Sequence, residues 1–203
     1  IAANRVPDVS YVAKFGRNDD IDTTPVGLNP EDIWIGGGLY PGFVPTSEIG
    51  TVTVTAELDA DDAAGVGMQR IKLYGLGANL LFQTEILDMG GTGGVISDKE
   101  WYRIHRAKGV RGGTSETNIG FIDISHTGGL TSTLAHIAAG IGATEQATFT
   151  PAVDTIAVVT LRLAIVNNSP SAAKDGRIAW AIREFNSSFW QILNPIRIAT
   201  TSP

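Results

Sequence analysis

The sequence has 203 residues, of which 43% are hydrophobic and only 18% charged, so it can build a substantial core while part of its surface is expected to meet another protein. The net charge of −6 and the lack of any Lys/Arg run argue against nucleic-acid binding, which needs clustered positive charge. The absence of cysteine excludes disulfides, thiolate metal ligands and a cysteine nucleophile. The longest apolar stretch is far shorter than the roughly 20 residues that span a membrane, so no membrane contact is expected.

Residues 1–47 are expected to form an extended arm. Five prolines and the Gly36-Gly37-Gly38 triplet remove backbone donors and loosen the chain, which disfavours a long helix or a central strand. The apolar side chains of the arm would be costly to leave in water, so we expect it to dock on the main domain or on a neighbouring subunit. The arm residues expected to bind a partner are Phe15, Arg17, Ile33, Trp34, Tyr40 and Phe43.

Residues 48–203 are expected to form a strand-rich body. Aliphatic and threonine side chains first alternate with a period of two at residues 51–58, which indicates a half-buried strand. The alternation returns at residues 70–73, and Gly75 and Gly77 are expected to end that strand. Further strands are expected at residues 80–87, 101–107, 118–125, 131–137, 145–150, 155–166, 176–185 and 189–200.

These elements predict an all-β fold, an antiparallel β-sandwich that is jelly-roll-like and is preceded by the Pro/Gly-rich N-terminal arm. The turns between strands are supplied by paired glycines, which adopt the required backbone conformations at little cost. Evidence for a helix is confined to the alanine-rich residues 134–141, which are short and close on Gly140 and Gly142.

The sequence offers little catalytic chemistry. No G-x-S-x-G motif occurs, and His105, His126 and His136 stand apart without an H-E-x-x-H pattern. His105 is expected to pack or hydrogen-bond on a strand face. The carboxylates that a glycan depolymerase would need show no favourable pairing; the candidates are Glu85, Asp88, Glu100, Asp123 and Glu184. We therefore expect a protein that is not an enzyme.

Aspartates cluster at residues 19–22 and 59–62, and oxygen-rich clusters are what Ca²⁺ prefers. The second cluster has Ala63 and Ala64 where a calcium loop needs an oxygen ligand and a glycine, so a solvated turn is expected instead. For the first cluster we expect an Asx-turn or a salt bridge to Arg17. No metal and no cofactor are expected.

Two N-terminal motifs stand out, KFGRNDDIDT at residues 14–23 and PEDIWIGGGLYP at residues 30–41. They resemble the signature of a family of structural proteins from the virions of tailed double-stranded DNA phages. The likeness continues through residues 61–76, with a D-x-x-A-G-x-G block, and through residues 101–107, 118–120 and 137–140. Residues 25–29 form an insertion between the two motifs, relative to the spacing expected in that family.

The resemblance implies a virion protein without enzymatic activity. Together with the arm and the low charge, it favours a capsid-surface decoration or cement protein, a homotrimer whose arm clamps neighbouring major capsid subunits. The alternative is a tail, neck or fibre component with a host-contact role, in which exposed aromatic side chains would touch host glycans. Both would have the same fold, so the sequence does not separate them.

Overall fold

The computed structural model describes residues 14, 16–17, 33–36, 40–42, 49–127, 133–157, 175–183 and 190–199. The chain divides into two compact units, Ile1–Thr155 and Ile156–Pro203. The expected boundary between arm and body, at residues 47 and 48, lies outside the described residues and stays a prediction.

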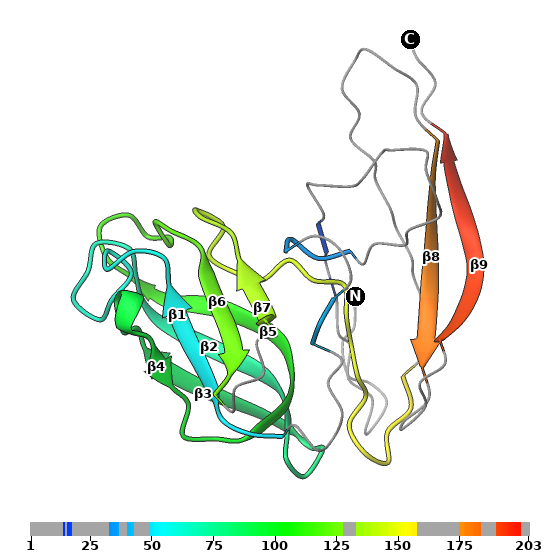
Figure 1. Cartoon of the computed structure of the whole chain (residues 1–203), viewed down its shortest axis with the longest axis horizontal. Helices are drawn as coiled ribbons and strands as arrows, with labels where there is room; N and C mark the ends of the chain where they lie inside the picture. The colour runs from blue at the N-terminus through cyan, green and yellow to red at the C-terminus, as the bar shows by residue number, and fades with distance from the viewer. Residues whose placement is uncertain are drawn as a thin grey trace, which may run out of the picture. The chain divides into compact units, whose positions relative to one another are not determined.

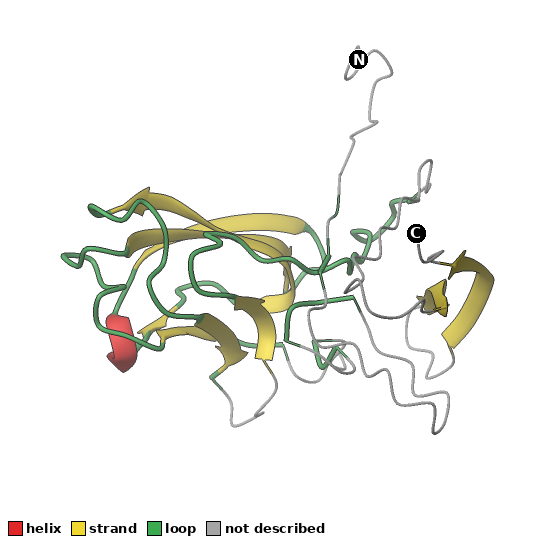
Figure 2. Cartoon of the chain, turned by 90° about the horizontal axis from the view of Figure 1, so that it is seen from above, coloured by secondary structure: helices red, strands yellow, loops and turns green. Residues whose placement is uncertain are grey.

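The first unit contains two antiparallel sheets (Figure 1). One, the four-stranded sheet, has the order β4-β1-β6-β7, formed by β1 (Val52–Ala56), β4 (Val95–Ile96), β6 (Ile122–His126) and β7 (Thr133–Ile137). The other, the three-stranded sheet, has the order β3-β2-β5, formed by β2 (Met68–Gly77), β3 (Phe82–Asp88) and β5 (Trp101–Gly112). Figure 2 shows them as two layers of strands. The expected all-β antiparallel sandwich is confirmed.

The core lies between the two sheets, because one buried cluster takes side chains from both of them. In β1 every second residue is buried, and the outward positions between them are threonines, so the period of two in the sequence corresponds to the two faces of the sheet. Trp101 at the start of β5 is fully buried in this cluster. Its partners include Val52 and Val54 of β1, Ile71 and Leu73 of β2, and Ile122 and Ile124 of β6.

Within its described residues, the second unit contains one antiparallel pair, β8 (Asp175–Arg183) and β9 (Trp190–Ala199). Its register runs from Asp175 opposite Ala199 to Arg183 opposite Trp190. Both elements were expected as strands, and both are confirmed. The described sandwich strands end at Ile137.

Several local predictions were wrong. Gly75 does not end β2, which continues past it to Gly77, the second glycine expected to end the strand. A Cβ at Gly75 would lie 1.8 Å from the carbonyl oxygen of Arg103, so this glycine allows β5 to approach closely rather than breaking the strand.

The strand expected at residues 131–137 is confirmed as β7 (Thr133–Ile137), so the alanine-rich residues 134–141 form no helix and continue after β7 as a turn. The only helical turn among the described residues is the 3-10 turn η2 (Gly91–Gly93). Residues 145–150 form no strand and make only an isolated bridge through Gln146. The short strand β4 was not expected, and the described part of the expected strand at 155–166, residues 155–157, is not extended into a ladder. No helix in the described part of the chain is long and apolar enough to cross a membrane.

Candidate functional site

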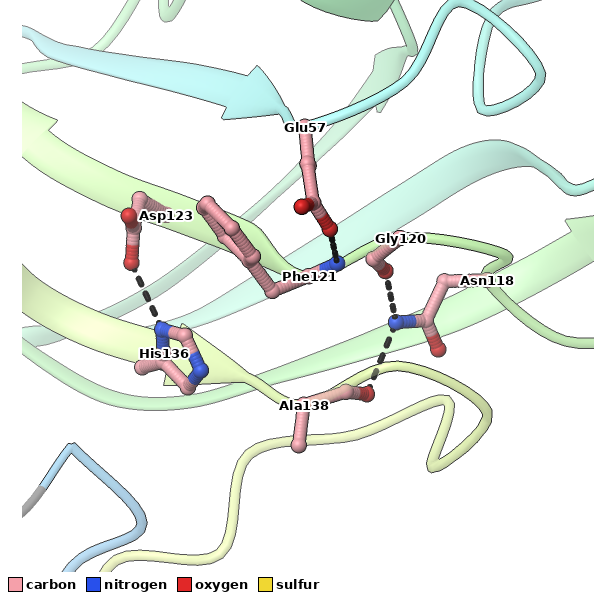
Figure 3. A network of polar contacts seen from close by, with 7 residues as sticks. All are labelled: Glu57, Asn118, Gly120, Phe121, Asp123, His136 and Ala138. Carbon is pink, nitrogen blue, oxygen red and sulfur yellow. Dashed lines mark hydrogen bonds and ion pairs between the residues drawn. The ribbon is translucent and has the colours of Figure 1, made fainter.

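The outer face of β6 and β7 carries the clearest polar pair of the first unit (Figure 3). Asp123 and His136 lie directly opposite each other in the strand register, so their side chains share one face. Asp123 Oδ1 lies 2.7 Å from His136 Nδ1. The ring of Phe121 stacks on the imidazole with ring centroids 5.6 Å apart. Both polar side chains are partly exposed, at 35% and 21%.

A carboxylate on Nδ1 fixes the orientation of an imidazole, as in hydrolase triads. Here, however, no hydroxyl group among the described residues hydrogen-bonds to His136, and the described residues hold no cluster of three His, Cys, Asp or Glu side chains around a possible metal. Neither Asp123 nor His136 lines the pockets of about 370 and 360 Å³. As described, the pair supplies cross-strand stabilisation and a polar surface.

Asn118 fixes the loops beside this pair (Figure 3). Its buried amide nitrogen donates to the carbonyl oxygens of Gly120 at 2.6 Å and Ala138 at 2.8 Å, and its amide oxygen accepts from the Gly142 N–H at 2.8 Å. The carboxylate of Glu57 accepts from the Phe121 N–H at 3.2 Å. Loops on both sides of β6 and β7 are therefore held by side chains whose hydrogen bonds are satisfied.

Asp61 is not part of a solvated turn, and that expectation was wrong. Its side chain is fully buried. Oδ1 accepts from the Met68 N–H at 2.7 Å, both carboxylate oxygens lie 3.0 Å from the Ile119 nitrogen, and Oδ2 accepts from the Gly120 N–H at 2.9 Å. One carboxylate thus joins the start of β2 to a loop 58 and 59 residues after Asp61 itself, and charge-assisted bonds of this kind are the stronger ones.

The other two aspartates of this cluster are closer to expectation. Asp62 accepts from the Ala64 N–H at 2.7 Å, which is an Asx-turn. Asp59 accepts from the Thr92 side chain and N–H, and these bonds, the side-chain one foremost, lower the pKa of the Asp59 carboxyl. The aspartates at positions 19, 20 and 22 lie outside the described residues.

The D-x-x-A-G-x-G block is a turn wrapped around the Asp61 carboxylate. A Cβ at Gly67 would lie 2.1 Å from Asp61 Oδ1, and one at Gly65 would lie 2.2 Å from the Ala60 carbonyl oxygen. Both distances are far below van der Waals contact, so the two glycines are needed for close packing in the turn. A structural requirement therefore accounts for this motif.

The expected partner-binding residues of the arm contact the body of the same chain where they are described. Trp34 forms a bridge with Gln146, and its ring meets that of Tyr40 edge-on with centroids 5.5 Å apart. The Tyr40 hydroxyl donates to the Leu134 carbonyl oxygen at 2.6 Å. Only 6% of Trp34 and 5% of Tyr40 are exposed.

Two other expected partner-binding residues, Ile33 and Arg17, also contact the body of the same chain. The Ile33 carbonyl oxygen accepts from the Ala147 N–H at 2.9 Å, and Arg17 Nε lies 3.3 Å from a Glu145 carboxylate oxygen. Phe15 and Phe43 are outside the described residues. Residues 133–147 therefore form the landing site of the described arm, and contact of these six residues with a partner stays a prediction.

His105 lies on the outward side of β5 in an aromatic cluster with Phe82 and Phe149. Its Nε2 accepts from the Thr150 N–H at 3.2 Å, and its carbonyl oxygen accepts from the ammonium of Lys14. Burial, with smaller contributions from the charges of Lys14 and Arg103, lowers the pKa of His105 from 6.5 to about 3. Burial likewise lowers the pKa of Lys14 to about 8. The expected packing and hydrogen-bonding role of His105 agrees with this arrangement.

The low pKa of His105 predicts a specific loss of stability in acid. Between pH 6.5 and about 3 the unfolded chain binds a proton at this residue and the folded chain does not, so the stability present above pH 6.5 falls as the pH falls. We expect a loss of about 3 kcal/mol from this residue between pH 7 and pH 4. Urea unfolding of the wild type and of His105→Gln at both pH values isolates the contribution of His105 to the free energy of unfolding, because the carboxylates titrate alike in both proteins. An equal pH dependence in the two proteins would refute the assignment.

Sequence reasoning did not single out Asp61, Asn118 or the Asp123–His136 pair as a site. The alternation of polar and apolar residues around Asp123 and His136 indicates that each faces outward, but only the strand register makes them neighbours. Comparisons with models of known families, with curated proteins and with solved structures found no match.

Proposed function

We propose that this chain is a structural protein of a tailed-phage virion that decorates the capsid surface and bridges major capsid subunits. The proposal begins from the resemblance of residues 14–23 and 30–41 to virion structural proteins. It also draws on the antiparallel sandwich, a compact body suited to repeated attachment on a shell.

The observation that carries the proposal furthest is how the described arm residues meet the body. They are tied down at separate points, by the ammonium of Lys14 on β5, by Arg17 at Glu145 and by the aromatic pair Trp34 and Tyr40 on residues 134–146. The described arm residues add no strand to either sheet of the sandwich. An arm anchored at points along its own body is suited to clamping, because the anchors fix where it leaves the body.

Copy number tests this role directly. Quantitative peptide mass spectrometry of purified particles, referenced to the major capsid protein, is expected to give hundreds of copies per particle. A shell-wide decoration protein must approach the stoichiometry of the shell itself.

Two outcomes would contradict a capsid-surface role. A handful to a few dozen copies would favour the tail, neck or fibre alternative. Absence from particles that contain the other structural proteins would remove the virion role altogether.

A further inference from the structure

Charge is segregated between the two halves of the described sandwich. Residues 68–112, which include the whole three-stranded sheet, contain seven Lys or Arg and four Asp or Glu. The described residues 50–67, 113–127 and 133–157 contain eight Asp or Glu and no Lys or Arg. This division follows the sheets, because the second set holds β1, β6 and β7, and β4 adds no charge.

The outward side of β2 and β5 forms a basic face, defined by Arg70, Lys72, Arg106, Lys108 and Arg111. The neighbours of Arg70 and Lys72 along β2, Ile71 and Leu73, are fully buried, so these two cations point away from the core. On β5, Arg106, Lys108 and Arg111 are exposed while Ala107 is buried.

The strand register places like charges opposite each other on this basic face. Lys72 pairs with Lys108, and Arg70 with Arg111. Like charges directly opposite across strands destabilise a sheet. Arg70 is compensated by Asp88 at 2.6 Å, and the same carboxylate also attracts Arg111. Lys72 lies over the Tyr74 ring, but no salt bridge among the described residues includes Lys72, Arg106 or Lys108. The fold thus keeps an unfavourable arrangement that an anionic partner would relieve.

The four-stranded sheet carries charge of the opposite sign. Its strands contain no Lys or Arg, and its outer side carries an acidic face formed by Glu57 and Asp123, with Asp59 and Asp62 in the loop that follows β1. Thr55, which precedes Glu57 by two residues on the same side, lies opposite Asp123. Since the sheets pack on each other through the core, the basic and acidic faces point in opposite directions.

We propose that the first unit associates head to tail with a second copy of this chain, the basic face of one copy against the acidic face of the next. Such a contact is heterologous, so it builds a closed ring when the rotation closes and an open chain otherwise. A second copy is favoured over nucleic acid because the complementary carboxylates belong to this sequence and its net charge of −6 repels phosphates. The inference does not depend on the proposed virion role.

Sedimentation velocity of the full chain tests the association. At 50 mM NaCl the average sedimentation coefficient is expected to rise with protein concentration, and at 500 mM NaCl to return towards the monomer value, because salt screens exposed charges. A protein that stays monomeric at all concentrations in 50 mM NaCl overturns the proposal. So does association that is unchanged by salt, or binding of a labelled 20-base-pair duplex without self-association.

A matched pair of charge reversals tests the basic face. Lys108→Glu is expected to weaken self-association by about tenfold. It also places a carboxylate opposite Lys72, so its melting temperature should equal or exceed that of the wild type. The control is Lys99→Glu, the same charge change at an exposed residue outside the basic face whose ammonium contacts the Thr84 carbonyl oxygen. Equal weakening by both reversals would mean that net charge, and not this face, controls association.

Mixing complementary variants tests the head-to-tail arrangement. Glu57→Gln with Asp123→Asn removes both charges of the acidic face but keeps oxygens that can accept from Phe121 and His136. This variant and Lys108→Glu should each be largely monomeric alone, whereas an equimolar mixture should form dimers, since each supplies the face that the other lacks. A mixture that stays monomeric under conditions where the wild type associates contradicts basic-on-acidic contact.

Discussion

Replacing Asp61 with alanine is expected to lower the free energy of unfolding by about 4 kcal/mol, the largest effect of any single polar substitution in the described sandwich. The carboxylate accepts from three backbone N–H groups, those of Met68, Ile119 and Gly120, and is fully buried. Alanine leaves these donors without partners in a space that the closely packed turn does not readily open to water. Urea unfolding at pH 7, followed by circular dichroism, measures the loss.

Two variants separate the buried carboxylate from a general effect of losing an aspartate. Asp61→Asn should be intermediate, because its amide offers one acceptor oxygen and turns a second donor towards the backbone N–H groups. Asp62→Ala removes one bond to the Ala64 N–H at a less buried position, so its effect should be much smaller. If Asp61→Ala and Asp62→Ala destabilise equally, the carboxylate of Asp61 does not hold the two loops together.

The strands could be predicted where one face is buried, because burial imposes a period of two on the sequence. Residues 51–58 carry this pattern, and β1 occupies Val52–Ala56. The strand prediction failed where the packing of a neighbouring strand determines which residue is required. Gly75 signals a break when read locally, yet it is in β2 because β5 passes too close for a side chain. At Ala135 the strand prediction for residues 131–137 succeeded against propensity. Alanine favours a helix, but Ala135 is buried in the core on β7, and tertiary packing overrides propensity.

The polar sites were harder to predict because their partners are distant in sequence. Asp61 belongs to an aspartate-rich run that resembles a solvated turn, and only the return of the chain at residues 119–120 buries it. The basic face is a similar case. Arg70 and Lys72 lie more than 30 residues from Arg106 and Lys108, so no run of positive charge marks the place where the strand register brings them together.

The composition predicted that the arm residues dock on a surface, but it did not predict which part of the body they contact. Aromatic side chains without a regular period indicate docking on some surface. Which surface depends on shape and on hydrogen-bond partners, here the Leu134 carbonyl oxygen for Tyr40 and Gln146 for the backbone of Trp34. This outcome assigns intramolecular contacts to Lys14, Arg17, Trp34 and Tyr40, and partner binding by the arm stays a prediction.

Two truncations are expected to separate these roles. Deleting residues 1–43 should abolish binding to particles that lack this protein and should also lower the melting temperature, since burial of Trp34 and Tyr40 against the body is lost, an effect of about 3 kcal/mol or more. Deleting residues 1–32 keeps both aromatic anchors, so the melting temperature should stay closer to that of the full chain. Binding should nevertheless be strongly weakened, because the first motif, residues 14–23, is gone.

Co-sedimentation of each truncated protein with such particles, together with thermal unfolding by circular dichroism, provides the readout. Loss of binding in the shorter deletion would locate the clamp before residue 33, because the body would still be folded and the aromatic anchors Trp34 and Tyr40 would still be in place. Full occupancy by the protein lacking residues 1–43 would show that the arm is not the attachment element. Attachment would then have to come from residues after 43.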